Sequence, residues 1–284
     1  MKRRIKIFFS SDKLQAYPFK GCDSSFPEFE KVPLITLTGV GRSGTHFYAE
    51  LLGRSPSVSA FHLDEIGNSV GDSFHQYTRW YNLPVDPEGM LHSRRFLAHK
   101  VNEANKILLE SNPYLTLHLE DFASEFDSKI VIVYRDPKKV IESHYNKGWY
   151  QDFTPVLKKG YSAPGFQYTH EKAHYSFGRL FPNNELELSQ WIKLSVVGKI
   201  AWYWKTIYSK IIEQVKNLEH VCLIRTDAID YHNYKLLSDF LEIDPVDVGA
   251  FDKILTSKPG KGTYTSRPKW DKLETDEFRI SISD

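Results

Sequence analysis

A glycine-rich loop between an apolar run and a helical run constrains this chain more than any other feature. Pro33–Thr38 (PLITLT) is short, apolar and β-branched, which predicts a buried strand. It leads into Gly39-Val-Gly-Arg-Ser-Gly-Thr45, after which Thr45–Leu52 carries apolar residues at helical spacing. Glycines let successive backbone N–H groups point into one concavity, and the helix N-terminus adds its partial positive charge. The pattern therefore predicts an anion site at the end of this strand.

The side chains of the loop favour an anion but not the usual ATP chemistry. Arg42 supplies a permanent charge, and Ser43, Thr45 and His46 supply further donors. The spacing resembles a Walker A loop, G-x-x-x-x-G-K-[ST], but Thr45 follows Gly44 directly and the lysine is absent. In kinases and ATPases that lysine reaches the transferred phosphate. Its loss counts against an ATP-driven mechanism, although a glycine turn that merely connects a strand to a helix would also fit the bare pattern.

Further strands and helices alternate along the chain. Lys129–Tyr134 reads as a second buried strand and Val221–Arg225 as a third strand. Helical patterns occupy Lys138–Tyr145, Ser189–Val215 and Tyr234–Leu241. Apolar strands that alternate with helices predict an α/β fold in which a central parallel sheet lies between two helical layers, as in P-loop proteins.

Composition limits the classes of protein that fit. The chain has 284 residues, 41% hydrophobic and 26% charged, and we expect one domain over 1–284 with a long loop or lid at about 148–182. The formal net charge is +1, so we expect no nucleic-acid partner. Two cysteines are too few for a disulfide framework, and no run approaches the roughly 20 apolar residues of a membrane span. A cytoplasmic protein without a membrane partner is expected; the oligomeric state is not predicted.

A second anion site is predicted after the strand that ends at Tyr134. Arg135-Asp-Pro137 follows this strand directly, and Ser143 lies eight residues beyond Arg135 on the expected helix. The carboxyl ends of strands in α/β folds face the crevice where ligands bind. An arginine with a serine suits a phosphate, although a surface arginine paired with Asp136 would fit the tripeptide alone.

These two segments resemble the sulfotransferase superfamily. PLITLTGVGRSGTHFYAELL is similar to the 5′-phosphosulfate loop of its carbohydrate and tyrosyl-protein branches, and VIVYRDPKKVIESHYNKGWY to its 3′-phosphate element. The resemblance implies 3′-phosphoadenosine-5′-phosphosulfate (PAPS) as the donor. It places Arg135 and Ser143 at the 3′-phosphate. Around the 5′-phosphosulfate it places Arg42, Ser43, Gly44, Thr45 and His46.

Two weaker similarities extend toward the C-terminus. Ile224–Ile243 resembles a late strand and helix of the same family, but no functional residue carries over. Ser257–Trp270 resembles the basic loop that closes over the nucleotide. The resemblance makes Lys261 and Arg267 candidate nucleotide ligands. Lys258 and Lys269 are further candidates, and at least two of the four are expected to be ordinary solvated charges.

Sulfuryl transfer needs an aligned donor, a stabilised leaving oxygen and a base for the acceptor's proton. Arg42 and the loop N–H groups can meet the first two needs, and no metal is expected to be required. The base candidates are His62, Asp64 and Glu65, which follow the first helix, as acidic or histidine residues do in related enzymes. Glu110-Ser-Asn-Pro113 is a second candidate region, although its polar groups would equally fix a turn.

We therefore expect an enzyme that moves a sulfuryl group from PAPS to a hydroxyl or amine of a small-molecule or carbohydrate acceptor. A P-loop kinase and a non-catalytic nucleotide-binding module of the same fold are the alternatives. Binding of adenosine 3′,5′-bisphosphate without Mg²⁺ distinguishes the first alternative, and absence of transfer to any acceptor distinguishes the second.

Overall fold

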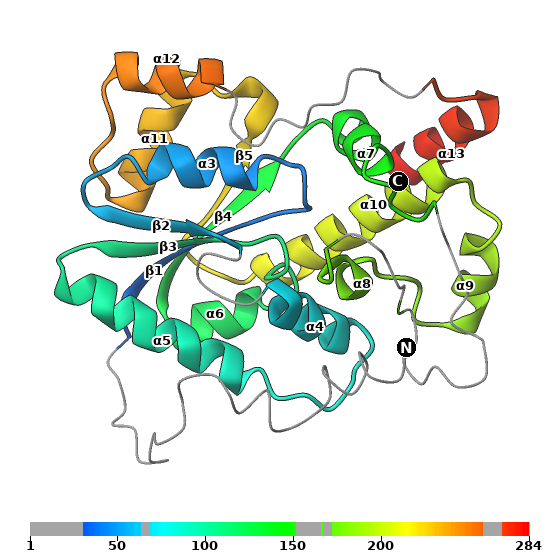
Figure 1. Ribbon diagram of the computed structural model, residues 1–284, viewed down its shortest axis with the longest axis horizontal. Coiled ribbons are helices and arrows are strands. Elements are labelled where there is room, and N and C mark those ends of the chain that lie inside the picture. Colours follow the sequence, from blue (N-terminus) through cyan, green and yellow to red (C-terminus); the bar gives the residue numbers. More distant parts are fainter. Residues whose placement is uncertain (1–30, 64–68, 152–165, 167–171, 258–268, 284) are drawn as a thin grey trace. The chain divides into compact units, whose positions relative to one another are not determined.

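Five strands, all parallel, form the central layer of the fold (Figure 1). The computed structural model describes residues 31–63, 69–151, 166, 172–257 and 269–283. The spatial order is β2-β3-β1-β4-β5. The strands are β1 (Pro33–Thr38), β2 (Val58–His62), β3 (Ile107–Ser111), β4 (Asp127–Tyr134) and β5 (Val221–Arg225). The glycine-rich loop therefore leaves the middle of the sheet.

Helices connect the strands and cover both faces of the sheet. Between β1 and β4 they are α3 (Thr45–Leu52), α4 (Ser69–Trp80), α5 (Glu88–Glu103) and α6 (Leu119–Glu125). Between β4 and β5 they are α7 (Pro137–Tyr145), α8 (Tyr175–Gly178), α9 (Glu185–Trp191) and α10 (Val196–Val215). After β5 come the short 3-10 turn η2 (Thr226–Ala228) and the helices α11 (Tyr231–Leu241), α12 (Val248–Ser257) and α13 (Lys272–Ser283). Within Val32–Asp284 the described elements form one compact unit.

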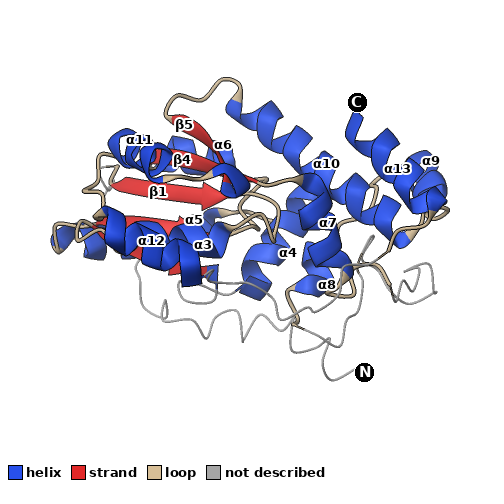
Figure 2. Ribbon diagram, turned by 90° about the horizontal axis from the view of Figure 1, so that it is seen from above, coloured by secondary structure: helices blue, strands red, loops and turns tan. Residues whose placement is uncertain are grey.

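The alternation of side chains along β4 explains the three layers. Val131 and Val133 pack with α3, α11 and α12 on one face, whereas Ile130 and Ile132 pack with α7 and α10 on the other. Successive side chains of a strand point to opposite faces, so a continuous apolar run requires a helical layer on each side. Figure 2 shows the strands enclosed by helices in this way. The predicted α/β fold is confirmed.

Several predicted elements match the structure residue for residue, namely the strands that end at Thr38 and Arg225 and the helix that ends at Leu52. The single helix predicted over Ser189–Val215 is wrong. Two helices, α9 and α10, occupy that range, because the Ser195 side chain accepts a hydrogen bond from the N–H of Gly198 and caps a new helix.

The lid predicted at about 148–182 falls largely on residues outside the described ranges. Its described ends belong to the core: Trp149, Tyr150, Phe177 and Phe181 are buried in the cluster that also contains α10. The Tyr150 hydroxyl donates to the carbonyl of Leu180 at 2.6 Å. These aromatic side chains therefore hold the two ends of the segment against the helical layer.

Pairing register places the ends of the strands side by side. Leu37 of β1 and His62 of β2 both pair with Ser111 of β3, and Thr38 pairs with Ile132 of β4. Carboxyl ends of parallel strands gather at one edge of the sheet, where ligands of α/β folds bind. In the described part of the chain, none of the helices has the length and apolar character that a membrane span needs.

Candidate functional site

The glycine-rich loop forms a tight turn that opens onto the N-terminus of α3. Arg42 has a φ of 71° and Gly44 a φ of 116°, and the N–H of Ser43 donates to the carbonyl of Val40 at 3.1 Å. No side chain in the described part of the chain caps α3 at Gly44. The first N–H groups of a helix have no acceptor within the helix, so they can bind an anion. The geometry of the loop is thus compatible with the predicted phosphate cradle.

Close packing explains two of the glycines. A Cβ atom at Gly39 would lie 2.3 Å from the carbonyl oxygen of Val133, and one at Gly44 would lie 2.6 Å from the Thr226 side chain. The Thr226 hydroxyl donates to the carbonyl of Ser43 at 2.6 Å. The turn η2 after β5 therefore supports the loop through contacts of Thr226 with Ser43 and Gly44. The sequence motifs did not indicate these contacts.

The loop side chains are not equally placed to meet a ligand. Ser43 and Thr45 are buried, and Ser43 Oγ lies 3.0 Å from the Cβ position of Gly39, inside the turn. His46 is exposed in the first turn of α3. Backbone N–H groups and Arg42 are consequently the main groups that the loop offers to an anion.

The two predicted anion sites are in direct contact. Arg42 Nε donates to Ser143 Oγ of α7 at 2.9 Å, and Arg135 Nη1 donates to the carbonyl of Arg42 at 3.3 Å. Both arginines and Ser143 are partly buried. Arg42 lies in the loop between β1 and α3, Arg135 directly follows β4, and Ser143 lies in the second half of α7. Side chains about a hundred positions apart in sequence therefore meet here.

Charged side chains of both signs meet at this edge of the sheet. Burial lowers the pKa of Arg135, Asp227 opposes that effect, and the neighbouring charge of Arg42 lowers this pKa further. Hydrogen bonds from Arg225 come first among the causes that lower the pKa of Asp227 to about 2, which keeps this carboxylate ionised and paired. Two arginines that repel each other in a partly desolvated place are stabilised when an anion binds between them.

One of the three candidate bases can be placed. His62 ends β2, and its ring lies 4.9 Å from the ring of His46. His62 Nδ1 lies 3.1 Å from Ser111 Oγ, and that hydroxyl donates to the carbonyl of Thr45 at 2.9 Å. The structure thus brings His62 next to the loop. Asp64 and Glu65 lie outside the described residues. So do Lys261 and Arg267 of the predicted C-terminal loop.

The second candidate region for a base lies in a buried network of hydrogen bonds. Glu110 is 1% exposed and accepts two hydrogen bonds from Arg94, at 2.7 and 3.0 Å. Arg94 also donates to Asp72 at 2.8 Å, and the Asn112 amide donates to both carboxylates. These hydrogen bonds connect α4, α5 and the carboxyl end of β3. Both carboxylates are thus engaged by Arg94 and Asn112 inside the protein.

His144 is a further member of the site that sequence reasoning missed. It is 1% exposed, its Nδ1 lies 3.0 Å from the carbonyl of Val140, and its Nε2 lies 3.5 Å from the Cβ position of Gly41. Burial, with a smaller contribution from Arg42, lowers the pKa of His144 to about 3. The ring is therefore neutral at physiological pH. The one sequence signal that could have pointed to His144 is its position directly after Ser143.

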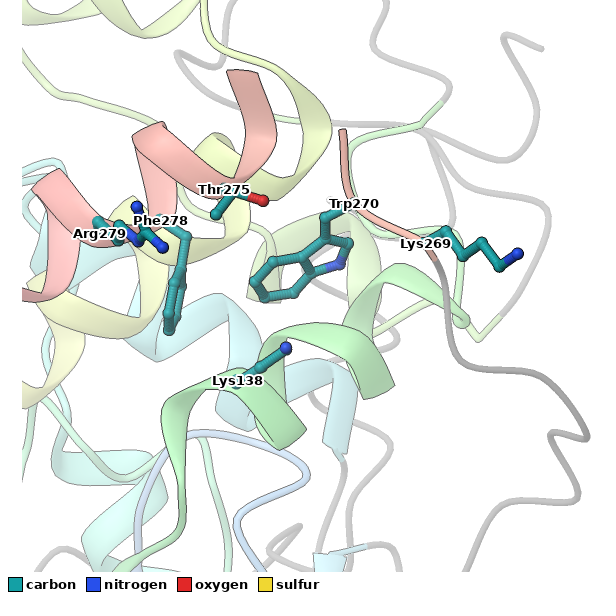
Figure 3. A pocket seen from close by; sticks show the side chains of 6 residues that line it. All are labelled: Lys138, Lys269, Trp270, Thr275, Phe278 and Arg279. Atoms are coloured by element: carbon teal, nitrogen blue, oxygen red, sulfur yellow. The ribbon is translucent and has the colours of Figure 1, made fainter. Parts of the chain in front are cut away.

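A hollow of about 520 Å³ lies between α7 and α13 (Figure 3). Its lining combines basic and aromatic side chains, namely Lys138, Lys269, Trp270, Thr275, Phe278 and Arg279. Lys138 Nζ lies 5.3 Å from the centre of the Trp270 ring. Lys269, one of the further candidate nucleotide ligands, lines this hollow, whereas Arg42, Arg135 and Ser143 do not.

Comparison with known proteins gives the family. The family model described as "Sulfotransferase domain" matches residues 33–226, which is more than half of the chain. No curated protein sequence matches. Solved structures include the sulfotransferase domain of the Synechococcus PCC 7002 olefin synthase, with 14% identity, a TM-score of 0.47, and coverage of 91% of this chain and 97% of that one. A sulfotransferase from Mycobacterium avium has 12% identity and a TM-score of 0.49, and the match covers 89% of this chain and 75% of that one. The extent of the family match shows that the chain belongs to the sulfotransferase family.

Proposed function

We propose that this sulfotransferase uses PAPS as its donor and transfers the sulfuryl group to a hydroxyl or amine of a small-molecule or carbohydrate acceptor. Adenosine 3′,5′-bisphosphate is the second product. The contact of Arg42 with Ser143, at 2.9 Å, carries the proposal. It joins the loop after β1 to the helix after β4, so one nucleotide with anionic groups at both its 5′ and 3′ positions can engage both. ATP has no 3′-phosphate.

Each anion has its own set of partners in this proposal. The N–H groups at the start of α3 and the Arg42 guanidinium hold the 5′-phosphosulfate. Arg135 and Ser143 hold the 3′-phosphate, because a guanidinium with a hydroxyl gives charge-assisted and directional hydrogen bonds. Lys261 and Arg267 remain proposed ligands of the same phosphate. The low cysteine count leads us to place the reaction in the cytoplasm.

The chemistry is an in-line displacement at sulfur. The acceptor oxygen or nitrogen forms a bond to sulfur as the bond from sulfur to the 5′-phosphate oxygen breaks, and the electron pair of that bond stays on the phosphate. Arg42 and the loop N–H groups stabilise the charge that develops on this oxygen. His62 takes the acceptor's proton as the general base. Asp64 and Glu65 remain the alternative bases.

Two measurements test the proposal. Calorimetry in the presence of EDTA is expected to detect binding of adenosine 3′,5′-bisphosphate, and ATP with Mg²⁺ is expected to bind at least tenfold more weakly. A screen of alcohols, phenols, amines and oligosaccharides with PAPS is expected to reveal a product heavier by one sulfuryl group. Tight binding of ATP that requires Mg²⁺ would instead favour a kinase. Nucleotide binding without transfer to any acceptor would favour a non-catalytic module.

A further inference from the structure

A chain of two hydrogen bonds runs from β2 through β3 to the end of the donor loop. His62 Nδ1 lies 3.1 Å from Ser111 Oγ, and Ser111 Oγ lies 2.9 Å from the carbonyl oxygen of Thr45. Ser111 is fully buried at the end of β3, opposite His62 in the strand register. Thr45 is the first residue of α3. Ser111 thus links the candidate base to the anion loop through these two bonds.

The direction of the protons in this chain follows from the chemistry of each group. A carbonyl oxygen can only accept, so Ser111 must donate its single hydroxyl proton to the carbonyl of Thr45. The Ser111 oxygen then has only lone pairs to offer, so the bond to His62 requires a proton on Nδ1. In the neutral ring the other nitrogen, Nε2, therefore carries the lone pair.

We propose that Ser111 is a positioning residue that holds His62 in the tautomer with Nδ1 protonated, so that Nε2 is the nitrogen that receives the acceptor's proton. This proposal rests on the proposed function. In the step, the acceptor O–H proton moves to Nε2 as the acceptor oxygen bonds to sulfur. The sulfur–oxygen bond to the 5′-phosphate breaks, and its electron pair remains on that phosphate.

The arrangement suits a base because the hydrogen bonds survive the proton transfer. Nδ1 donates to Ser111 both in the neutral ring and in the imidazolium, so proton uptake at Nε2 requires no rearrangement. The Ser111 oxygen also stabilises the imidazolium, since a charged donor makes the stronger hydrogen bond.

Two titratable side chains of the described residues lie near His62 or Ser111. Among the described residues, the imidazole of His46 faces it from α3, with ring centres 4.9 Å apart. Glu110 lies next to Ser111 on β3, but adjacent strand residues point to opposite faces of the sheet. Its carboxylate is bound to Arg94 of α5. The carboxylate of Glu110 is therefore not the partner of the histidine.

The tautomer can be measured without an acceptor. Two-bond ¹H–¹⁵N correlation spectra of protein labelled on histidine, with His62→Gln to assign the resonance, report which ring nitrogen carries the proton. We expect Nδ1 to be protonated in the neutral wild-type ring and Ser111→Ala to shift the population toward the Nε2–H form. An Nε2–H ring in the wild type, or an unchanged tautomer in Ser111→Ala, would overturn the proposal.

Kinetics with PAPS and an acceptor from the screen test the role in catalysis. We expect Ser111→Ala to lower kcat about tenfold, the worth of one hydrogen bond to a charged group, and to move the acidic limb of the pH profile to lower pH. Ser111→Thr, which keeps the hydroxyl, is expected to retain kcat within about threefold. A rise in the donor KM alone, with the acidic limb in place, would mean a merely structural contact with Thr45 and would refute the proposal.

A second buried serine provides the control. Ser128, the second residue of β4, makes a 3.1 Å hydrogen bond to Thr36 of β1. Ser128→Ala therefore removes a buried hydroxyl that has no part in the hydrogen bonds from His62 to Thr45. We expect it to leave the His62 resonance and the pH profile unchanged. If His62→Gln keeps the wild-type acidic limb, the positioning role of Ser111 is refuted while nucleotide binding continues to support the proposed function. Absence of both nucleotide binding and transfer in the wild type would instead refute the proposed function.

Discussion

Gly44→Ala is expected to damage the loop through two separate effects. The residue has a φ of 116°, where an L-residue is strained, and its Cβ would lie 2.6 Å from both the methyl group and the hydroxyl of Thr226. Ordinary contacts between such atoms begin at about 3.5 Å, so Thr226 must move. A left-handed backbone costs about 1–2 kcal/mol and the lost bond from Thr226 to Ser43 about 1 kcal/mol, which together lower the unfolding free energy by about 2–3 kcal/mol.

The assay combines denaturation with nucleotide binding. Urea titration should give the stability loss, and calorimetry with adenosine 3′,5′-bisphosphate should show at least about tenfold weaker binding, because a displaced loop loses charge-assisted N–H contacts. Gly89→Ala is the matched control, since nothing lies within 4 Å of the Cβ position there and the residue is in α5. It should be neutral or slightly stabilising.

A double mutant separates the clash from the backbone strain. Thr226→Ala removes the methyl group and the hydroxyl that Gly44→Ala would strike, and alone it should cost about 1 kcal/mol. The double mutant is therefore expected to lose less stability than the sum of the two single mutants. Strict additivity, or a Gly44→Ala protein with wild-type stability and wild-type affinity, would refute the reasoning.

Three further outcomes follow from titratable side chains inside the protein. Burial lowers the pKa of His144 to about 3 and that of His75 to about 4, below the ordinary 6.5. Between these lowered values and pH 6.5 the unfolded chain binds more protons than the folded one. The unfolding free energy should therefore fall as pH falls from about 6.5 to about 4. His144→Asn should reduce that slope by up to about 1.4 kcal/mol per pH unit in urea titrations; an unchanged slope contradicts the neutral buried ring. Arg94→Met should cost about 3–5 kcal/mol by leaving two buried carboxylates unpaired, whereas Arg79→Met, at a more exposed ion pair, should cost no more than about 1 kcal/mol; equal losses would contradict this contrast.

The elements predicted from sequence are those whose signal is local. The β-branched run before Gly39 and the run before Arg135 are continuous and apolar, and both lead into residues that only a loop or a helix start would favour. The strand of Ile107–Ser111 was missed because two of its five residues, Glu110 and Ser111, are polar. The helix break at Ser195 was missed because the apolar periodicity continues across it, although a serine before an apolar run is a capping signal.

The partners within the site could not be read from the chain. Ser111 meets His62 and Thr45 because β3 lies between β1 and β2, and this strand order is a property of the whole sheet. Thr226 contacts Ser43 because the turn after β5 packs against the loop, although the two residues are 183 positions apart in sequence. Motifs predicted which groups would bind an anion, whereas the topology decides which groups support them.

A comparison of two ligands and two proteins tests most directly whether one nucleotide spans both anion sites. Calorimetry in EDTA is expected to show that the wild type prefers adenosine 3′,5′-bisphosphate to adenosine 5′-monophosphate by about 10- to 100-fold, the worth of a phosphate held by charged hydrogen bonds. Arg135→Ala should lose most of this preference and bind the monophosphate within about twofold of the wild type. Arg54→Ala, at an exposed arginine near the other end of α3, should keep the preference. Equal affinities of the wild type for the two ligands, or an equal loss of both in Arg135→Ala, would contradict the account.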